Sequence, residues 1–290
     1  MLNLYTPTFG YSNDWKLTQE LCDSMHRAES PHSIAIRIHP ATMVFSFVAT
    51  ILLVWIASAT AFEENLPRSV SPIAYRDVND AQVSLLGYMV LPPSLALIKI
   101  DTFYKDNSTD DDFDDSDFGF PAVIILPDSN NINGYEISRA TRIAGQLGCI
   151  AFVADIYGSD LHDVQDFQQR TKLANNYKAN HTSFRSRIKS AIVTLGKQPY
   201  VNPSKIALVG YGLGGTGALL YSFAGSNRNT VAAVSFHGEL LGRPLTGTAT
   251  NPILVLSGSR DDAGFDVELL EESLVAAGVD WQITRYSGWY

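Results

Sequence analysis

The feature that most constrains the fold of this chain is an apolar strand that runs through a glycine-rich turn straight into a helix. Residues 205–209 read KIALV, residues 210–215 read GYGLGG, and a helix is predicted over Gly215–Ala224. A turn so rich in glycine permits positive φ angles and close backbone approach. This order of strand, turn and helix is the setting of a nucleophile elbow, where the central residue of the turn lifts a reactive side chain above a sheet.

From about residue 71 onward, short apolar runs alternate with segments of helical periodicity. This alternation predicts an α/β fold with a mostly parallel central sheet and helices on both faces. Strands are predicted at Gln82–Leu91, Ala96–Tyr104, Pro121–Pro127, Cys149–Ala154, Lys205–Val209, Val231–Phe236, Pro252–Ser257 and Trp281–Arg285. Helices are predicted at Tyr135–Leu147, Ser183–Leu195, Gly215–Ala224 and Asp266–Ala277.

The central residue of the predicted elbow is Gly212, which tolerates strained angles but carries no oxygen or sulfur that could attack a carbonyl. Starting at Gly210, the same letters also match GxGxxG, the phosphate-binding turn of dinucleotide folds. That motif normally lies in the first βαβ unit and is followed about twenty residues later by an acidic residue at a strand end. Here the corresponding stretch is Val234–His237, without an acid, so the elbow is favoured.

The charge and cysteine content exclude several classes of function. The formal net charge is −9, and the lysines and arginines are scattered along the chain. Such a chain offers no basic face for nucleic acid or for an anionic membrane surface. The two cysteines, Cys22 and Cys149, predict neither a disulfide framework nor a thiolate metal site. Cys149 opens the apolar run CIAFVA and is interpreted as a core residue.

A run of acidic residues, Asp110–Asp117, separates two predicted strands. It reads as a solvated insertion, because like charges repel one another and resist packing. Calcium binding is the alternative interpretation, but the run lacks the spacing of an EF-hand loop.

The N-terminal region has the form of a targeting leader. Residues 44–59 carry no charge, and Ala59-Thr60-Ala61 has the small residues that signal peptidase prefers. Met43 stands directly before the run, so residues 1–42 are interpreted as an unstructured or wrongly annotated extension. Residues 43–61 are predicted to be a signal peptide or, as the alternative, a retained signal anchor that would tie the protein to a membrane.

The predicted destination is the secretory pathway, with the protein secreted or lumenal. Two glycosylation sequons, beginning at Asn107 and Asn180, follow the leader, as a lumenal domain permits. The junction Ala61-Phe62 also resembles the cleavage site of bipartite leaders in algae with complex plastids, so plastid import is a further alternative.

A series of motifs, in order, carries a family resemblance: YRDVNDAQVSLLGYMVLP, PAVIILPD, NGYE, FVADIYG, QPYVNPSKIALVGYGLGGTGAL, VSFHGEL, PILVLSGSRDD and WQITRYS. From about Ile73 to its C-terminus, the chain resembles the dienelactone hydrolases of the α/β-hydrolase superfamily. The resemblance implies an α/β-hydrolase domain over residues 71–290 that is truncated at its C-terminus. It also implies hydrolysis of small carboxylic esters or lactones through an acyl-enzyme, with no metal or organic cofactor.

The resemblance also assigns the catalytic positions. The family's nucleophilic cysteine maps onto Gly212, and its triad aspartate onto Asp261, or onto Asp262 if the alignment slips by one residue. The family's histidine falls one position after Tyr290, beyond the sequence. The oxyanion-hole amides map onto Leu213 and a residue near Asn130. The resemblance therefore implies that two of the three catalytic side chains are missing.

Other residues could supplement this site. Arg170, in QQRTK, is the nearest match to a family arginine that meets a substrate carboxylate. Ser129 stands where the family often has an acidic or aromatic residue. His237 ends a strand on the side of the sheet where such sites form, but we interpret it as making local hydrogen bonds only. His162 and His181 lie in a helical excursion after residue 157.

Two hypotheses follow for the function. In the first, the chain is a degraded or incompletely represented hydrolase with little or no turnover. In the second, it is a non-catalytic binding protein that keeps the hydrolase pocket for a small ester, lactone or carboxylate ligand. Both make a small molecule the partner of the pocket.

Overall fold

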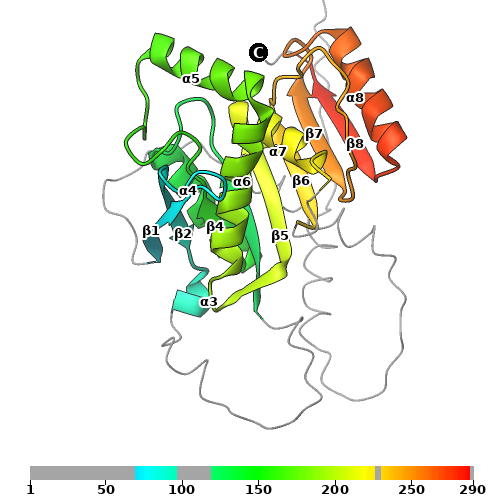
Figure 1. Cartoon of the computed structure of the whole chain (residues 1–290). Coiled ribbons are helices and arrows are strands. Elements are labelled where there is room, and N and C mark those ends of the chain that lie inside the picture. The colour runs from blue at the N-terminus through cyan, green and yellow to red at the C-terminus, as the bar shows by residue number, and fades with distance from the viewer. Residues whose placement is uncertain (1–68, 97–118, 226–229, 288–290) are drawn as a thin grey trace, which may run out of the picture. The chain divides into compact units, whose positions relative to one another are not determined.

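The computed structural model describes residues 69–96, 119–225 and 230–287 (Figure 1). Four predicted features lie outside the described residues: the extension 1–42, the leader 43–61, the sequon at Asn107 and the acidic run 110–117. Those predictions remain predictions.

Within the described residues, strands and helices alternate as the sequence predicts. The strands are β1 (Val70–Arg76), β2 (Ser84–Val90), β3 (Phe120–Leu126), β4 (Ile150–Val153), β5 (Val201–Tyr211), β6 (Ala232–Phe236), β7 (Ile253–Gly258) and β8 (Trp281–Tyr286). The helices are α3 (Pro93–Ala96), α4 (Gly134–Leu147), α5 (Phe167–Ala179), α6 (His181–Gly196), α7 (Leu213–Ser222) and α8 (Gly264–Ala277).

The strands of the described ranges form one sheet in the order β1-β2-β4-β3-β5-β6-β7-β8. β1 pairs antiparallel with β2, and β2 antiparallel with β4, whereas every later pair is parallel. The mostly parallel sheet of an α/β-hydrolase fold is therefore confirmed. The carboxyl ends of β3, β5, β6 and β7 lie along one edge, which is where sites form in such sheets.

Three segments differ from the sequence prediction. Ala96, predicted to begin a strand, is the last residue of the short helix α3, and the rest of that strand, 97–104, lies outside the described residues. β1 was not predicted, because Pro72 interrupts its pattern; proline is tolerated there because β1 is an edge strand. β5 begins at Val201 rather than Lys205.

The early start of β5 has a local cause. The pairing of β3 with β5 shifts register between Phe120, which faces Val201, and Ala122, which faces Ile206. The bulge leaves the intervening residues of β5 without ladder partners, so Pro203 can lie inside the strand.

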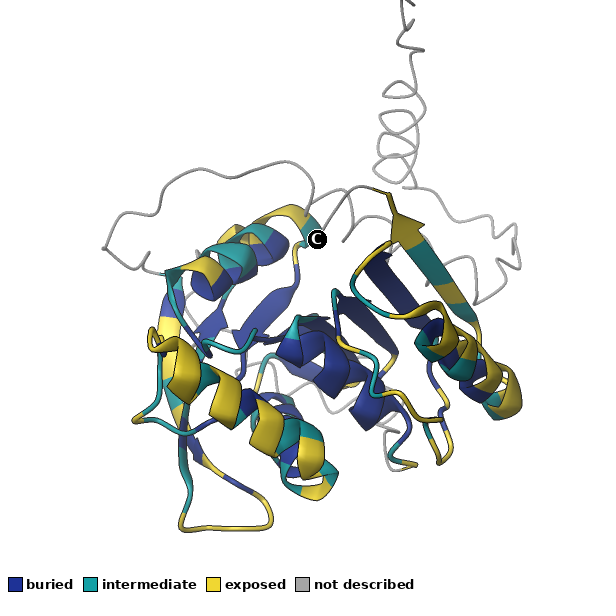
Figure 2. Ribbon diagram, turned by 90° about the horizontal axis from the view of Figure 1, so that it is seen from above, coloured by how far each residue is buried: buried dark blue, intermediate teal, exposed yellow. Residues whose placement is uncertain are grey.

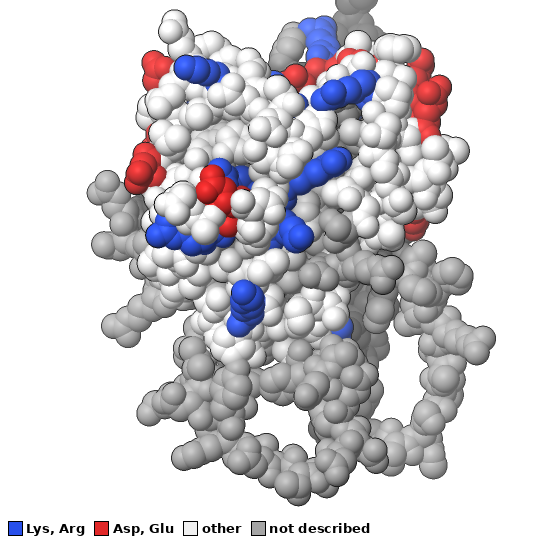
Figure 3. Space-filling view, viewed as in Figure 1, with Lys and Arg blue, Asp and Glu red and all other residues white. Residues whose placement is uncertain are grey.

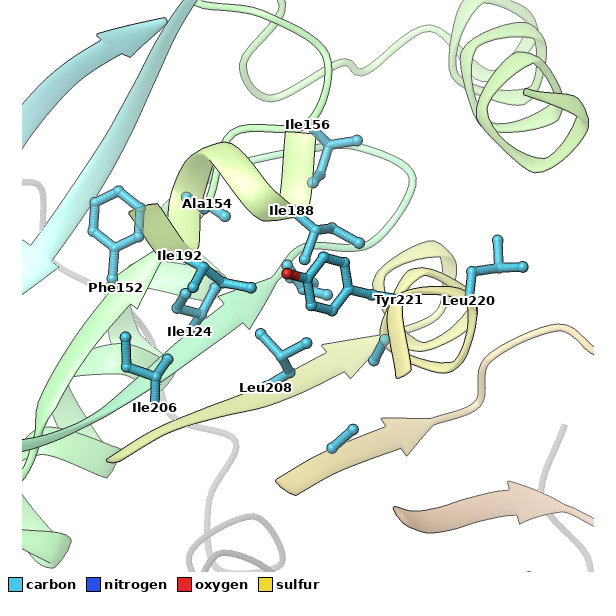
Figure 4. Close-up of a cluster of buried hydrophobic side chains, with 14 of the residues drawn as sticks. Ile124, Phe152, Ala154, Ile156, Ile188, Ile192, Ile206, Leu208, Leu220 and Tyr221 are labelled. Atoms are coloured by element: carbon cyan, nitrogen blue, oxygen red, sulfur yellow. The ribbon is translucent and has the colours of Figure 1, made fainter. Parts of the chain in front are cut away.

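An apolar cluster covers each face of the sheet, and successive side chains of β3 point alternately into the two clusters. Val123 and Ile125 pack on the side covered by α4, and Ile124 on the side covered by α6 and α7. Figure 1 shows α6 crossing in front of the sheet. Figure 4 shows the second cluster, in which Ile124, Phe152, Ile206 and Leu208 of the sheet meet Ile188 and Ile192 of α6 and Leu220 and Tyr221 of α7.

Helix α7 is the most enclosed helix of the described residues, since all of its residues are buried. Figure 2 shows it dark blue along its length, whereas α5 and α8 have yellow outer faces. Gly214 permits its close approach to the sheet, because a Cβ there would overlap the carbonyl oxygen of Leu126 in β3. The helix that follows the glycine-rich turn is thereby fixed against the sheet.

The charged side chains of the described surface are mixed in sign, as the scattered lysines and arginines of the sequence predict. On the face shown in Figure 3, lysines and arginines are interspersed with acidic side chains. No helix within the described ranges is long and apolar enough to cross a bilayer.

Candidate active site

The glycine-rich turn has the backbone conformation that an elbow requires. Gly212 caps the N-terminus of α7 with φ 52° and ψ −118°, in the left-handed region that favours glycine. Its amide donates to the carbonyl of Phe236 in β6 at 2.8 Å, and its carbonyl accepts from Thr216 at 3.2 Å. The turn is therefore held at the carboxyl end of β5, between the sheet and the first turn of α7.

The place where residue 212 would carry a side chain is occupied by Asp128. A Cβ built on Gly212 would overlap the Oδ1 atom of Asp128 and lie 2.6 Å from its Cγ. The Leu213 amide, expected to be an oxyanion donor, donates to the same Oδ1 at 3.2 Å. Asp128 follows β3, the sheet neighbour of β5, so the chain places a carboxylate where a side chain at residue 212 would stand.

The predicted triad acid, Asp261, holds an imidazole that the sequence interpretation did not assign to it. The Nδ1 atom of His237 lies 2.5 Å from the Oδ2 atom of Asp261, and the Gly258 amide donates to the same oxygen at 2.5 Å. The side chain of His237 is 32% exposed and that of Asp261 14% exposed. The expectation that His237 makes only local hydrogen bonds is wrong, because its partner follows the next strand of the sheet.

The backbone around His237 is unusual for a residue other than glycine. Its φ of 50° lies in the left-handed region, and its amide donates to Leu256 of β7 at 2.8 Å. Its ring packs edge-on against Tyr211, with the ring centroids 5.6 Å apart. Conformations of this kind cost free energy and cluster at functional sites.

A pocket of about 280 Å³ opens beside these groups. It is lined by Asp128, Ser129, Phe167, Arg170, Thr171, Ala174, Asn175, Lys178, Gly212, Leu213, Thr216, His237 and Glu239. The elbow, Asp128 and His237 thus face one cavity, and α5 supplies the wall across from them.

Helix α5 brings two cationic side chains to the pocket. The Arg170 guanidinium lies over the Phe167 ring, 5.6 Å from its centroid, and Phe167 is 69% exposed. Lys178 forms an ion pair of 2.6 Å with Glu239, which follows β6. Arg170, predicted from sequence to meet a substrate carboxylate, is therefore on the pocket wall.

Two other predicted positions lie elsewhere. Asn130 does not line the pocket described above, and its carbonyl accepts from the Val164 amide at 2.8 Å. Asp262, the alternative triad acid, uses its Oδ1 atom to accept from the Leu240 amide at 2.9 Å. Burial, with Asp261 nearby, raises the pKa of Asp262. Of the two acids, Asp261 is the one that contacts the His237 imidazole.

The remaining candidate side chains are engaged away from the elbow. His162 lies 3.3 Å from Asp155, and His181 contacts Arg243 at 2.6 Å. Burial raises the pKa of the Cys149 thiol to about 12, which keeps it protonated and unreactive at neutral pH. Within the described ranges, no group of three or more histidine, cysteine or acidic residues could hold a metal ion.

The sequence analysis did not consider Asp128, and it gave His237 only local hydrogen bonds. Asp128 lies two residues after β3 and His237 one residue after β6, and both strands are sheet neighbours of β5. The usable signal was the strand end, since polar residues there meet at one edge of a parallel sheet.

Comparisons with known proteins indicate the family and the fold of the chain. A family model described as the dienelactone hydrolase family matches residues 114–290. A dienelactone hydrolase-like promiscuous phosphotriesterase from metagenomic libraries is 21% identical, with a TM-score of 0.59 over 76% of this chain and 82% of that one. A structure from Klebsiella pneumoniae, assigned to the dienelactone hydrolases, is 16% identical, with a TM-score of 0.54 over 75% and 85% of the two chains. A search among curated proteins gave no match.

Proposed function

The chain belongs to the dienelactone hydrolase family, and from that premise we propose that it binds a small ester, lactone or carboxylate at the elbow without forming an acyl-enzyme. The family implies small ester or lactone substrates. The proposal concerns what this chain does with them.

One observation carries the proposal: the Asp128 carboxylate occupies the space of the missing nucleophile at Gly212. Acyl-enzyme formation needs a side-chain oxygen or sulfur at that point and an amide free to stabilise the oxyanion. Gly212 supplies no such atom, and the Leu213 amide is hydrogen-bonded to Asp128. An ester that enters the pocket meets a carboxylate where the family presents its attacking group.

The pocket nevertheless keeps groups that recognise a carbonyl or carboxylate. Arg170 faces it from α5 and can donate two parallel hydrogen bonds to a carboxylate. Phe167, beside Arg170, offers an exposed ring on which the apolar part of a small ligand can pack. A ligand with a carboxylate would direct that end toward Arg170 and away from Asp128.

The test is covalent labelling of the full chain by p-nitrophenyl acetate, followed by intact-mass and peptide mass spectrometry. We expect no acetyl adduct on any residue of the pocket in the wild type. In parallel, titration with a small lactone and with its ring-opened acid, monitored by calorimetry, should show saturable binding that Arg170→Ala weakens. An acetylated pocket residue in the wild type, or no saturable binding of either ligand, would contradict the proposal.

A gain-of-function variant tests the assignment of the elbow. Gly212→Cys combined with Asp128→Ala places a thiol at the turn and removes the carboxylate that it would overlap. We expect acetyl labelling at position 212 in this double variant. Thr171→Cys, on the α5 wall of the same pocket, is the matched control and should label at no more than the rate of a free thiol.

We also propose that the chain enters the secretory pathway, as the uncharged segment 44–59 and the sequon at Asn180 suggest. Asn180 is exposed and caps α6, where its Oδ1 atom accepts from the Ser183 amide at 3.1 Å. Its Nδ2 atom is the glycosylation site, so a glycan is compatible with the cap. Expression in a eukaryotic secretory host should give a glycosidase-sensitive mass shift that Asn180→Gln reduces.

A further inference from the structure

We propose that the pocket hydrolyses activated esters directly with water, with His237 as the general base and Asp261 as the residue that positions it. This activity goes beyond ligand binding, and it rests on the proposed function because it takes place in the same pocket. It needs neither a nucleophile at Gly212 nor an acyl-enzyme.

The first support is the orientation of the imidazole. Asp261 binds the Nδ1 atom of His237 at 2.5 Å and is itself fixed by the Gly258 amide. A carboxylate on Nδ1 selects the tautomer in which Nε2 has a free lone pair. His237 lines the pocket and its side chain is 32% exposed, so Nε2 can accept a proton from a water molecule there.

The second support is the place of this pair in the sheet. β6 lies between β5 and β7, so His237 stands between the elbow and Asp261, as the imidazole does in a catalytic triad. Backbone hydrogen bonds fix both sides, from Gly212 to Phe236 and from His237 to Leu256. The pair therefore has the order of a triad in which water takes the part of the nucleophile.

The third support is the backbone strain at His237. A φ of 50° disfavours most residues with a Cβ, and it is maintained here by the ladder contact of the amide and the contact of the ring with Tyr211. These contacts, with that to Asp261, hold the imidazole in one place at the pocket.

The chemical step balances with water as the only co-reactant. A water proton passes to Nε2 of His237 while the water oxygen forms a bond to the ester carbonyl carbon, whose π electrons move to the oxygen. The tetrahedral intermediate then re-forms the carbonyl and breaks the bond to the leaving oxygen, which takes the proton back from Nε2. The products are a carboxylic acid and an alcohol, and the imidazole is regenerated.

Asp128 limits the rate of this reaction. The oxyanion that forms in the tetrahedral intermediate requires a donor, and the Leu213 amide donates to Asp128 instead. Asp128→Ala frees that amide and removes a negative charge, so hydrolysis should become about tenfold faster or more.

The experiment measures the hydrolysis of p-nitrophenyl acetate by the full chain at neutral pH, corrected for the uncatalysed rate, with kcat and KM determined separately. Asparagine tolerates the left-handed region better than most residues, so His237→Asn preserves the backbone. We expect this variant to lose activity by about 100-fold. His181→Asn, which alters a histidine outside the pocket, is the matched control and should keep the wild-type rate.

Asp261→Asn tests positioning separately from chemistry. Removal of the carboxylate releases Nδ1 and so no longer selects the tautomer in which Nε2 is the acceptor, and we therefore expect kcat to fall about tenfold while KM for the ester stays unchanged. A purely structural role of Asp261 would instead change KM as well, because the pocket itself would be deformed.

The outcomes separate this inference from the proposed function. Saturable lactone binding together with unchanged hydrolysis in a folded His237→Asn variant overturns the inference and leaves the binding function intact. Absence of binding in the wild type overturns the proposed function. Binding with loss of hydrolysis in His237→Asn and a lowered kcat at unchanged KM in Asp261→Asn supports both.

Discussion

Two aspartate–histidine pairs lie near strand ends in the part of the chain that the structure describes, and they differ in what surrounds the carboxylate. Asp155, just after β4, is completely buried and lies 3.3 Å from His162. It also accepts hydrogen bonds from the Leu86 amide at 3.0 Å, the Asn131 side chain at 2.9 Å and the Gly158 amide at 2.9 Å. This carboxylate joins β2, β4 and the loop after β3.

In the second pair, Asp261 and His237, the carboxylate accepts fewer hydrogen bonds and both side chains are more exposed to solvent than in the first pair. Asp261 accepts from Gly258 and His237 through one oxygen, and the imidazole faces a cavity. The difference teaches that the residue types of a pair do not determine its role. A carboxylate whose lone pairs are all engaged in the interior holds strands together, whereas a partly exposed one can orient a base.

The pKa of Asp155 reflects this environment. Burial by itself would raise it, but the hydrogen bonds from His162, Asn131 and the amides of Gly158 and Leu86 outweigh burial and hold the pKa below its ordinary value. A carboxylate with a lowered pKa in the folded state contributes stability at neutral pH. The following four predictions test the contrast between the pairs, from the largest effect to the smallest.

Asp155→Ala should produce the largest loss of stability. It leaves the buried Asn131 side chain and two part-buried amides without their acceptor, and the cost should be about 3–5 kcal/mol in the free energy of unfolding. Urea unfolding followed by circular dichroism measures it. A loss below about 1 kcal/mol would mean that these donors find other partners and that Asp155 is not structural.

Asp155 should also contribute to the pH dependence of stability, and this effect should be smaller than the loss of stability in Asp155→Ala. Because its folded pKa is lowered, its contribution is present above the unfolded value of about 4 and is lost as pH falls through the folded pKa. Wild-type stability should therefore fall below about pH 4, and the fall should be shallower in Asp155→Asn. Some slope should remain, because the pKa of Asp77 is also lowered: burial would raise it, but hydrogen bonds from Ser186, Asn79 and Arg187 outweigh that. Equal slopes in variant and wild type would refute the assignment.

Asp261→Ala should cost much less stability than Asp155→Ala, about 1 kcal/mol, since its carboxylate is partly exposed and water can replace it at the Gly258 amide. The same urea experiment compares the two variants directly. A loss as large as that of Asp155→Ala would erase the distinction between the pairs.

His162→Gln should have the smallest effect. The side chain is 20% exposed and supplies one of several contacts to Asp155, so the loss should be about 0.5–1 kcal/mol. Ester hydrolysis should not change, in contrast to His237→Asn. A drop in kcat/KM in a folded variant would show that the Asp155–His162 pair affects catalysis in the pocket.

The sequence predicted most of the fold because apolar runs and helical periodicity are local signals. β3 is an example, since PAVIILP already has the composition of a strand buried on both faces. The local signal failed at two prolines, Pro72 in β1 and Pro203 in β5. Proline is tolerated on an edge strand and at a bulge, and both features depend on strand pairing, which the local sequence does not show.

The candidate site was predictable only in part. Gly212 and Asp261 were identified because each lies in a motif that the family shares. Asp128 and His237 were not assigned, because their contacts depend on the spatial order of β3, β5, β6 and β7 and on side-chain direction. A strand order is a non-local property, so a strand-end position indicated the edge of the sheet but not which residues meet there.

The contact between Asp128 and the Leu213 amide has a consequence for selectivity. Helix N-termini attract stray phosphate, sulfate and acetate, because their amides lack intrahelical partners. At α7 the protein meets that demand with its own carboxylate. The N-terminus of α7 should therefore bind free phosphate or sulfate only weakly, and an anionic ligand of the pocket should depend on Arg170 rather than on this helix end.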